Sequence, residues 1–181
     1  WASAGNVATQ LVLAVSVDLI ITNSGALPNP CGNFVLPDDA VKIADIKNFD
    51  QYSLAILEYM SKRNLNLDDT DYYWSSSLGY RDRLIIPFYY EDRIVGWTGR
   101  SIIDDKKPRY LTEVQPGFVY GLDEQGPNKI FCIVVEGQLD AIHIDGCALG
   151  GNEIADQQAM LLNRLQKQII VVPDRDKAGS K

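Results

Sequence analysis

Hydrophobic and polar positions follow two different periods in the middle of this chain, and each predicts a different element. In residues 49–63 the apolar side chains leave the charged ones on the other face of a helix. Asp50 is a suitable N-cap, so the pattern predicts an amphipathic helix. Residues 83–90 and 93–100 are rich in β-branched and aromatic side chains and are separated by a polar pair. They predict two strands paired as a β-hairpin.

From residue 129 onward, short aliphatic runs alternate with helical segments. A continuous aliphatic run is typical of a strand buried on both faces of a parallel sheet, and β–α alternation implies right-handed crossovers. The expected order is strand 130–135, helix 138–145, strand 147–149, helix 153–167 and strand 169–172. The fold class is therefore α/β, a parallel sheet flanked by helices, preceded by an α+β region that holds the first helix and the hairpin.

Turn-forming residues dominate much of the N-terminal part. Residues 22–40 concentrate Pro, Gly, Asn and Asp, which predicts a loop or linker. Residues 11–21 are apolar, but Asp18 interrupts them and they are too short to span a membrane, so we expect a buried element. The expected divisions are an N-terminal segment or linker, a subdomain with the hairpin, and the α/β domain: residues 1–48, 49–127 and 128–181.

Composition narrows the function classes further. The chain has 181 residues, is 46% hydrophobic and carries a net charge of −7, so it can bury a core and lacks a generally basic nucleic-acid-binding surface. Its three cysteines lack the spacing of a zinc site or a disulfide framework, so we expect reduced thiols and a cytoplasmic protein. The chain begins without Met and stops at Lys181, where another helix should start, so we expect a fragment.

Carboxylates directly follow two of the predicted strands. Glu136 and Asp140 follow the first in the segment Glu-Gly-Gln-Leu-Asp, and Asp174 and Asp176 follow the last in Asp-Arg-Asp-Lys-Ala-Gly. Because the carboxyl ends of parallel strands meet at one edge of a sheet, we expect all four acids to converge there. Carboxylates without histidine or thiolate favour Mg²⁺ or Mn²⁺ over zinc, and such a site suits phosphoryl chemistry. The single histidine, His143, is expected to be an ordinary helix residue.

A simpler interpretation of these acids also exists. Asp174 and Asp176 could be solvated loop residues, and Glu136 could interact with the N-terminal end of a helix dipole. Two such segments, each after a buried strand and joined by an α/β unit, favour the metal site. The chain contains no GxxxxGK[ST] loop, and its Gly-Gly pair lacks GxGxxG spacing, which argues against a P-loop ATPase or a dinucleotide enzyme in this segment.

The two acidic segments resemble the Toprim domain, a metal-binding α/β module of bacterial-type primases, type IA and II topoisomerases and some nucleases. The similarity covers roughly residues 129–179. It implies that Glu136 is an acid/base or metal-linked group, that Asp174 and Asp176 hold magnesium, and that Asp140 supports the site.

Upstream segments resemble the RNA-polymerase domain of DnaG-type primases of bacteria and phages. They are Arg83-Leu84-Ile85-Ile86-Pro87-Phe88, Ile94-Val95-Gly96-Trp97-Thr98-Gly99-Arg100, Pro108-Arg109-Tyr110-Leu111 and Tyr120-Gly121-Leu122. In that family these segments form a subdomain packed against Toprim, and basic residues between the two face the template. Gly151 stands where bacterial primases usually have threonine, so the resemblance is to a divergent, phage-like form.

Basic and aromatic residues near the hairpin are candidate contacts to a single strand, since cations bind phosphates and aromatic rings stack on bases. The candidate phosphate contacts are Arg100, Lys107 and Arg109. Tyr110 or Trp97 could stack on a base. Alternatively, the two aromatics belong to the core and the lysine pair at 106–107 to a solvated turn.

The resemblance implies a nucleotidyltransferase, a DNA-directed RNA polymerase that makes short RNA primers from ribonucleoside triphosphates on single-stranded DNA, with Mg²⁺ or Mn²⁺. It also allows a replicative helicase as a partner and implies no membrane. The expected location is the bacterial cytosol, or an infected host cell for a phage protein. Two alternatives are another Toprim enzyme, a nuclease or topoisomerase, and a non-catalytic module that binds DNA or a helicase.

Overall fold

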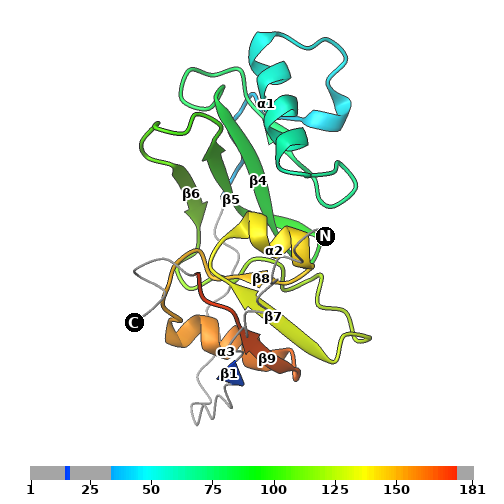
Figure 1. The fold of residues 1–181 in the computed structure, drawn as a ribbon, viewed down its shortest axis with the longest axis vertical. Coiled ribbons are helices and arrows are strands. Elements are labelled where there is room, and N and C mark those ends of the chain that lie inside the picture. The colour runs from blue at the N-terminus through cyan, green and yellow to red at the C-terminus, as the bar shows by residue number, and fades with distance from the viewer. Residues whose placement is uncertain (1–14, 17–33, 175–181) are drawn as a thin grey trace, which may run out of the picture.

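Two β-sheets organise the part of the chain that the structure describes. This is a computed structural model, and it describes residues 15–16 and 34–174. One sheet has five strands in the order β2-β3-β4-β5-β6, and the other has four in the order β1-β9-β7-β8. In Figure 1 helix α1 lies beside the five-stranded sheet, while α2 and α3 lie with the four-stranded sheet.

The five-stranded sheet is antiparallel and is built around the predicted hairpin. Its elements in chain order are β2 (Val41–Lys42), η1 (Ile43–Asp45), α1 (Gln51–Lys62), β3 (Tyr73–Trp74), β4 (Arg83–Tyr90), β5 (Arg93–Ser101) and β6 (Tyr110–Val114). Strands β4 and β5 pair along their whole length, which confirms the hairpin. The two turn residues Glu91 and Asp92 both have positive φ, 49° and 59°, as a tight two-residue hairpin turn requires.

Helix α1 begins where the sequence predicts. The Asp50 carboxylate accepts hydrogen bonds from the backbone N–H groups of Tyr52 and Ser53, at 3.0 and 2.8 Å, so Asp50 is its N-cap. The buried ridge differs from a purely apolar stripe, because Ser53 is buried with Ile56 and Met60. The Ser53 hydroxyl closes a capping box with Asp50, which satisfies it within the ridge.

The four-stranded sheet contains the predicted alternation of strands and helices. Its elements are β1 (Val15–Ser16), β7 (Phe131–Val135), α2 (Gln138–Ile144), β8 (Cys147–Ala148), α3 (Asp156–Arg164) and β9 (Gln168–Val171). Strand β7 pairs in parallel with β8 and β9, which confirms the parallel sheet, and β1 pairs antiparallel with β9 at one edge. Helix α3 is shorter than the expected 153–167 at both ends, because it starts only after the N-cap Ala155 and already ends before the C-cap Leu165.

The expectation that these strands are buried on both faces holds fully for one face and only in part for the other, where Val135 is the buried residue of β7. Side chains alternate between faces along a strand, and Cys132, Val134 and Ile169 on one face are at most 6% exposed. On the other face Ile133 and Ile170 are only half-buried. Cys132 and Cys147 are free thiols on the buried face, with their Sγ atoms 3.4 Å apart.

A buried segment after β6 joins the two sheets into one core. Tyr120 forms an isolated antiparallel bridge with Ala148, with both backbone hydrogen bonds near 3.0 Å. Phe88 of the hairpin stacks on Phe118 at 6.0 Å and meets Tyr120 edge-on at 5.4 Å. The carboxyl ends of β7, β8 and β9 therefore lie next to the hairpin sheet.

Helix α2 is also held against the end of α1. Nδ1 and Nε2 of His143 lie 2.7 and 2.9 Å from the carbonyl oxygens of Leu139 and Arg63, so the ring connects α2 with the end of α1. This confirms His143 as a structural helix residue. No helix in the described parts of the chain is both long and apolar enough to cross a membrane.

Candidate functional site

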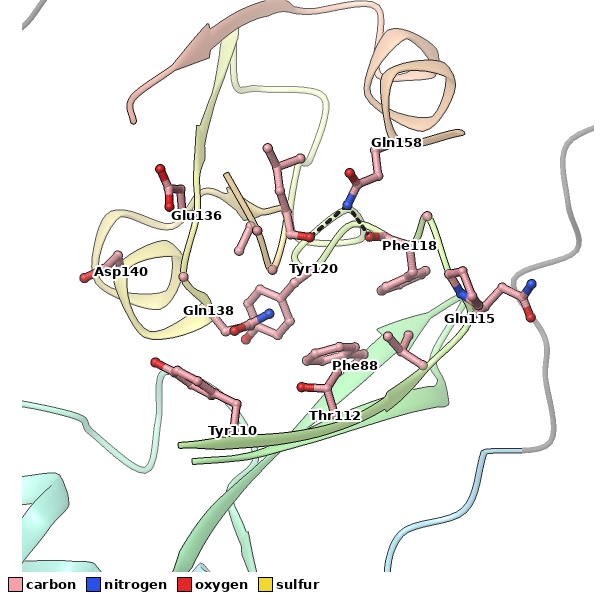
Figure 2. Close-up of a pocket in the computed structure, with 18 of the residues that line it drawn as sticks. Phe88, Tyr110, Thr112, Gln115, Phe118, Tyr120, Glu136, Gln138, Asp140 and Gln158 are labelled. Carbon is pink, nitrogen blue, oxygen red and sulfur yellow. Dashed lines mark hydrogen bonds between the residues drawn. The ribbon is translucent and has the colours of Figure 1, made fainter. Parts of the chain in front are cut away.

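A pocket of about 400 Å³ lies between the two sheets. The hairpin sheet contributes side chains from β4 and β6, the joining segment contributes Phe118 and Tyr120, and the four-stranded sheet contributes the residues that follow β7, β8 and β9. Figure 2 shows these residues facing the pocket from its two sides. The pocket therefore sits at the carboxyl edge of the parallel strands, where the sequence places the acids.

Three of the predicted acids line this pocket. Glu136 follows β7 and is half-buried, Asp140 lies in the first turn of α2, and Asp174 lies just after β9. The backbone N–H of Asp174 donates a hydrogen bond to Oε1 of Glu136 at 3.1 Å, so the ends of β7 and β9 are joined at this point. Figure 2 shows Glu136 and Asp140 near the start of α2.

Two glycines shape the backbone around Glu136. A Cβ atom at Gly137 would lie 2.8 Å from Oδ2 of Asp140, so the glycine lets that carboxylate fold back against the turn. Gly150 has a φ of +74°, and its N–H donates to the carbonyl oxygen of Glu136 at 2.9 Å. The loop after β8 is thereby fixed to the end of β7.

The described acids do not by themselves form a ligand cluster. Among residues 15–16 and 34–174 no group of three His, Cys, Asp or Glu side chains is close enough to hold a metal ion. Asp176, the fourth expected acid, lies outside the described residues. The convergence of all four acids stays a prediction, although Glu136, Asp140 and Asp174 share one pocket.

Arg83 holds the segment that carries the predicted basic residues, a role that the sequence analysis missed. It is 2% exposed, and its guanidinium donates to the carbonyls of Gly99, Pro108 and Arg109 at 3.0, 2.8 and 3.4 Å. Burial lowers the pKa of Arg83. The signal in the sequence was a lone arginine at the start of an otherwise apolar strand.

The predicted phosphate contacts differ in exposure. Lys107 and Arg109 are exposed, on either side of the Pro108 whose carbonyl Arg83 binds. Lys106 instead pairs with Asp82, with 2.7 Å between Nζ and Oδ2, so this lysine is not simply solvated.

Arg100 and Tyr110 form a cation–π pair on adjacent strands. Arg100 is 5% exposed, and its guanidinium carbon lies 4.7 Å from the centroid of the Tyr110 ring. Tyr110 is 38% exposed and lines the pocket, so it covers Arg100. The roles predicted for both residues stay predictions, and Tyr110 is the more accessible of the two.

Trp97 is a core residue, which is the second of the two roles that the sequence left open for it. It is 1% exposed, its Nε1–H donates to the carbonyl of Val35, and its ring meets Tyr80 edge-on at 5.6 Å. Trp97 and Arg100 are three positions apart on β5, so they point to opposite faces of the sheet. Trp97 therefore faces away from the pocket.

Gln158 ties the pocket together from α3. It is 6% exposed, and its Nε2 donates to the carbonyls of Phe118 and Leu149 at 3.0 and 2.8 Å, as Figure 2 shows. Its Oε1 accepts the N–H of Ala155 at 3.1 Å. Gln158 lies on the buried face of α3, and the sequence gives no sign of these partners.

Comparison with known proteins reveals relatives along just over half of the chain. No protein-family model matches it. The DNA primase of Clostridium acetobutylicum is 31% identical over 115 residues, which are 55% of this chain and 19% of that protein. The DNA primase of Deinococcus radiodurans is 35% identical over 121 residues, which are 56% of this chain and 21% of that protein. The chain thus spans about a fifth of the length of these curated relatives.

Solved structures show the same fold. The RNA polymerase domain of Mycobacterium tuberculosis primase DnaG, in complex with a double-stranded DNA oligomer with an overhang, matches with a TM-score of 0.59 and 16% identity, over 76% of this chain and 61% of that one. A DnaG primase catalytic domain bound to single-stranded DNA matches with a TM-score of 0.54 and 18% identity, over the same shares. The chain is similar to DnaG-type primases.

The similarity to DnaG confirms the expected fold class. This chain, with its parallel strands and helices beside the hairpin sheet, matches a DnaG catalytic core and a DnaG RNA polymerase domain with TM-scores of 0.56 and 0.58. The resemblance inferred from the acidic segments and the hairpin is thereby confirmed as well.

Proposed function

We propose that this chain is the RNA-polymerase region of a DNA primase, which makes short RNA primers from ribonucleoside triphosphates on a single-stranded DNA template. One observation carries the proposal. The pocket between the sheets has strand-end carboxylates, Glu136 and Asp174, on one side and the accessible aromatic ring of Tyr110 on the other. The names of the relatives support it, since all are called DNA primase.

A divalent cation is the cofactor that suits these acids. Glu136, Asp140 and Asp174 offer carboxylate oxygens, and no His or Cys is among the described residues that line the pocket, so Mg²⁺ or Mn²⁺ fits better than zinc. We assign Glu136, Asp174 and Asp176 as metal ligands, with Asp140 in support. Such an ion, when bound, stabilises the charge that develops on pyrophosphate and activates a ribose hydroxyl.

Glu136 is the candidate proton acceptor of the reaction. It is half-buried, and the N–H of Asp174 holds one of its oxygens at 3.1 Å, so its carboxylate is oriented toward the pocket. A fixed carboxylate at hydrogen-bonding distance from a hydroxyl is what general-base catalysis requires. The pocket next to Glu136 is large enough to hold a nucleotide-sized ligand.

The template strand approaches from the hairpin sheet in this proposal. Lys107 and Arg109 are exposed cations directly before Tyr110, which lines the pocket. Cations that bind phosphates next to a ring that stacks on a base are typical of single-strand binding. One similar structure is of a DnaG catalytic domain bound to single-stranded DNA. A replicative helicase is a further proposed partner.

The decisive experiment is primer synthesis by the full-length protein with single-stranded DNA, labelled ribonucleotides and Mg²⁺. Glu136→Gln and Asp174→Asn should each reduce RNA product by at least about a hundredfold, because each removes a charge that the transition state needs. Template binding, measured by fluorescence anisotropy, should change less than about twofold, since the proposed template contacts lie on the other sheet.

Matched controls are Glu58→Gln on α1 and Asp68→Asn, two exposed acids that do not line the pocket. Both should retain full synthesis. Normal RNA synthesis by either pocket variant, or cleavage of the DNA in place of RNA synthesis by the wild type, would rule out the proposed function.

A further inference from the structure

Gln138 is the first residue of α2 and lines the pocket beside the acids. It is 7% exposed. Positions two residues apart on a helix differ by about 200° in direction, so Gln138 and Asp140 point to different sides of α2. Figure 2 shows the Gln138 side chain directed into the pocket, toward Tyr110 and Tyr120, while Glu136 and Asp140 lie on the other side of the start of α2.

The amide of Gln138 makes no hydrogen bond to any residue within the described ranges, 15–16 and 34–174. Gln158, which is buried to the same degree in the same pocket, has both ends of its amide satisfied. The amide atoms of Gln138 are not among the fully buried side-chain atoms that lack a partner in the described residues, so the amide faces the open pocket. The polar end of Gln138 is thus available for a ligand that supplies both a donor and an acceptor.

The surroundings of this amide favour a nucleobase. Tyr110, Phe88 and Tyr120 line the pocket. Phe88 and Tyr120 are buried and make its wall apolar, so Tyr110, at 38% exposed, is the ring that can stack on a base. Burial raises the pKa of Tyr120, so its phenol stays neutral. No Lys or Arg is among the described residues that line the pocket, which favours a base over a phosphate as the partner of this amide.

Gly150 leaves room for such a ligand. A Cβ atom at this position would lie 3.3 Å from Nε2 of Gln138, so a side chain here would press on the amide. Glycine is also favoured by the φ of +74°. The loop after β8 therefore keeps the amide approachable while its own N–H holds the carbonyl of Glu136.

We propose that Gln138 is a specificity-determining residue that reads the edge of a nucleobase in this pocket, with adenine preferred. Glutamine pairs with adenine through two hydrogen bonds, its oxygen accepting from N6–H and its nitrogen donating to N7. This inference rests on the nucleic-acid chemistry of the proposed function. The base belongs either to the template or to the incoming nucleotide, which share this recognition chemistry.

The test measures binding by the full-length protein without turnover. In one arm, fluorescence anisotropy follows labelled pyrimidine-rich single strands that differ in one central base. In the other, ATP, CTP, GTP and UTP compete for the site in the presence of Mg²⁺. The wild type should prefer adenine by about tenfold or more in at least one arm. The arm that shows the preference identifies the source of the base.

Two substitutions separate base reading from a structural role. Gln138→Met keeps the length of the side chain and removes the amide, so adenine should fall to the level of the other bases. Gln138→Glu keeps an acceptor and loses the donor, so the preference should move toward cytosine, whose N4–H₂ group donates to a carboxylate. The control is Gln168→Met, at an exposed position on β9, which should leave the preference unchanged.

Lack of base preference in both arms by the wild type, or an unchanged preference in Gln138→Met and Gln138→Glu, overturns the inference. Primer synthesis tells this failure apart from failure of the proposed function. If the wild type makes primers but Gln138→Met keeps the adenine preference, only the base-reading role falls. If the wild type binds adenine selectively but makes no RNA, only the polymerase activity falls.

Discussion

The two sheets place their functional side chains in different ways. In the antiparallel hairpin sheet, Arg100 and Tyr110 stand on the face, as cross-strand neighbours on β5 and β6. In the parallel sheet, Glu136 and Asp174 follow the ends of β7 and β9. Parallel strands share a carboxyl edge, whereas antiparallel strands do not, so acids can gather at the end of only one of these sheets. The Tyr110 ring and the acids thus reach one pocket from a face and from an edge.

The largest effect is expected on removing Arg83, which anchors the proposed template-binding segment of the hairpin sheet. In Arg83→Met the carbonyls of Gly99 and Pro108 lose their donor, so the unfolding free energy should fall by about 3 kcal/mol. Template affinity should fall with it, because the segment that carries Lys107 and Arg109 is no longer fixed. Urea unfolding and anisotropy measure the two effects. Arg93→Met, at an exposed position of the same hairpin, should change neither; equal losses in both variants would contradict the anchoring role.

The next largest effect is expected at Gln158, which connects α3 with the segment that joins the two sheets. Gln158→Met removes the two hydrogen bonds that connect α3 with Phe118 and Leu149 and the one that Ala155 donates at the start of the helix. We therefore expect a loss of about 1–3 kcal/mol in unfolding free energy. Primer synthesis should fall while template affinity is retained, since the template side of the pocket stays intact. Chemical denaturation and the synthesis assay give the two numbers. Gln168→Met serves as the exposed control, and an unchanged stability of Gln158→Met would show that the joint does not depend on this amide.

The exposed cations of the hairpin side should act through salt-dependent binding alone. Lys107→Ala and Arg109→Ala should each weaken template affinity a few-fold and lower the slope of log affinity against log salt concentration by about 0.7, the value for one phosphate contact to a single strand. Titrations at several salt concentrations measure the slope. Lys47→Ala, at an exposed position outside this segment, is the control. A slope that stays at the wild-type value in both variants would place the template elsewhere.

The smallest effect is expected in the pH dependence of stability, through Asp39, which precedes β2. Asp39 accepts hydrogen bonds from the hydroxyls of Ser75 and Ser76 and from the N–H of Ser77, and the bond from Ser75 is the main cause that lowers its pKa from 3.8 to about 2. A lowered pKa in the folded state contributes stability above about pH 4 that is lost as the pH falls toward 2.

As the pH is lowered from about 5 to about 2, the thermal unfolding midpoint should therefore fall less steeply in Asp39→Asn than in the wild type. The neighbouring exposed Asp38→Asn should behave like the wild type. Parallel curves for wild type and Asp39→Asn would show that this carboxylate does not couple to folding.

The sequence predicted the elements well, because their signals are local. The helix after Asp50, the hairpin at residues 83–101 and the order of strands and helices after residue 129 all follow from short-range periodicity and capping. The acids at the ends of β7 and β9 could be placed for the same reason, since a strand end is a local feature. The first turn of α3 was misplaced by three residues, a common error at helix ends.

Partners remote in sequence could not be predicted. Arg83 binds carbonyls about 16–26 positions away, and Gln158 binds Phe118 across 40 positions; backbone carbonyls leave no trace in a sequence. The unpaired amide of Gln138 also depends on the packing of two sheets. One feature of Trp97 could have been predicted. Residues three apart on a strand point to opposite faces, so Trp97 and Arg100 could not both face the template.

The neighbouring thiols Cys132 and Cys147 allow opening of the parallel sheet to be measured as a rate of chemical modification. Both are completely buried, so an alkylating reagent reaches them only when the packing around β7 and β8 opens. These strands lead directly to Glu136 and Gly150. In a Cys31→Ser background, the rate of alkylation therefore reports how often the acid-bearing edge comes apart, and a nucleotide that binds the closed pocket should slow it.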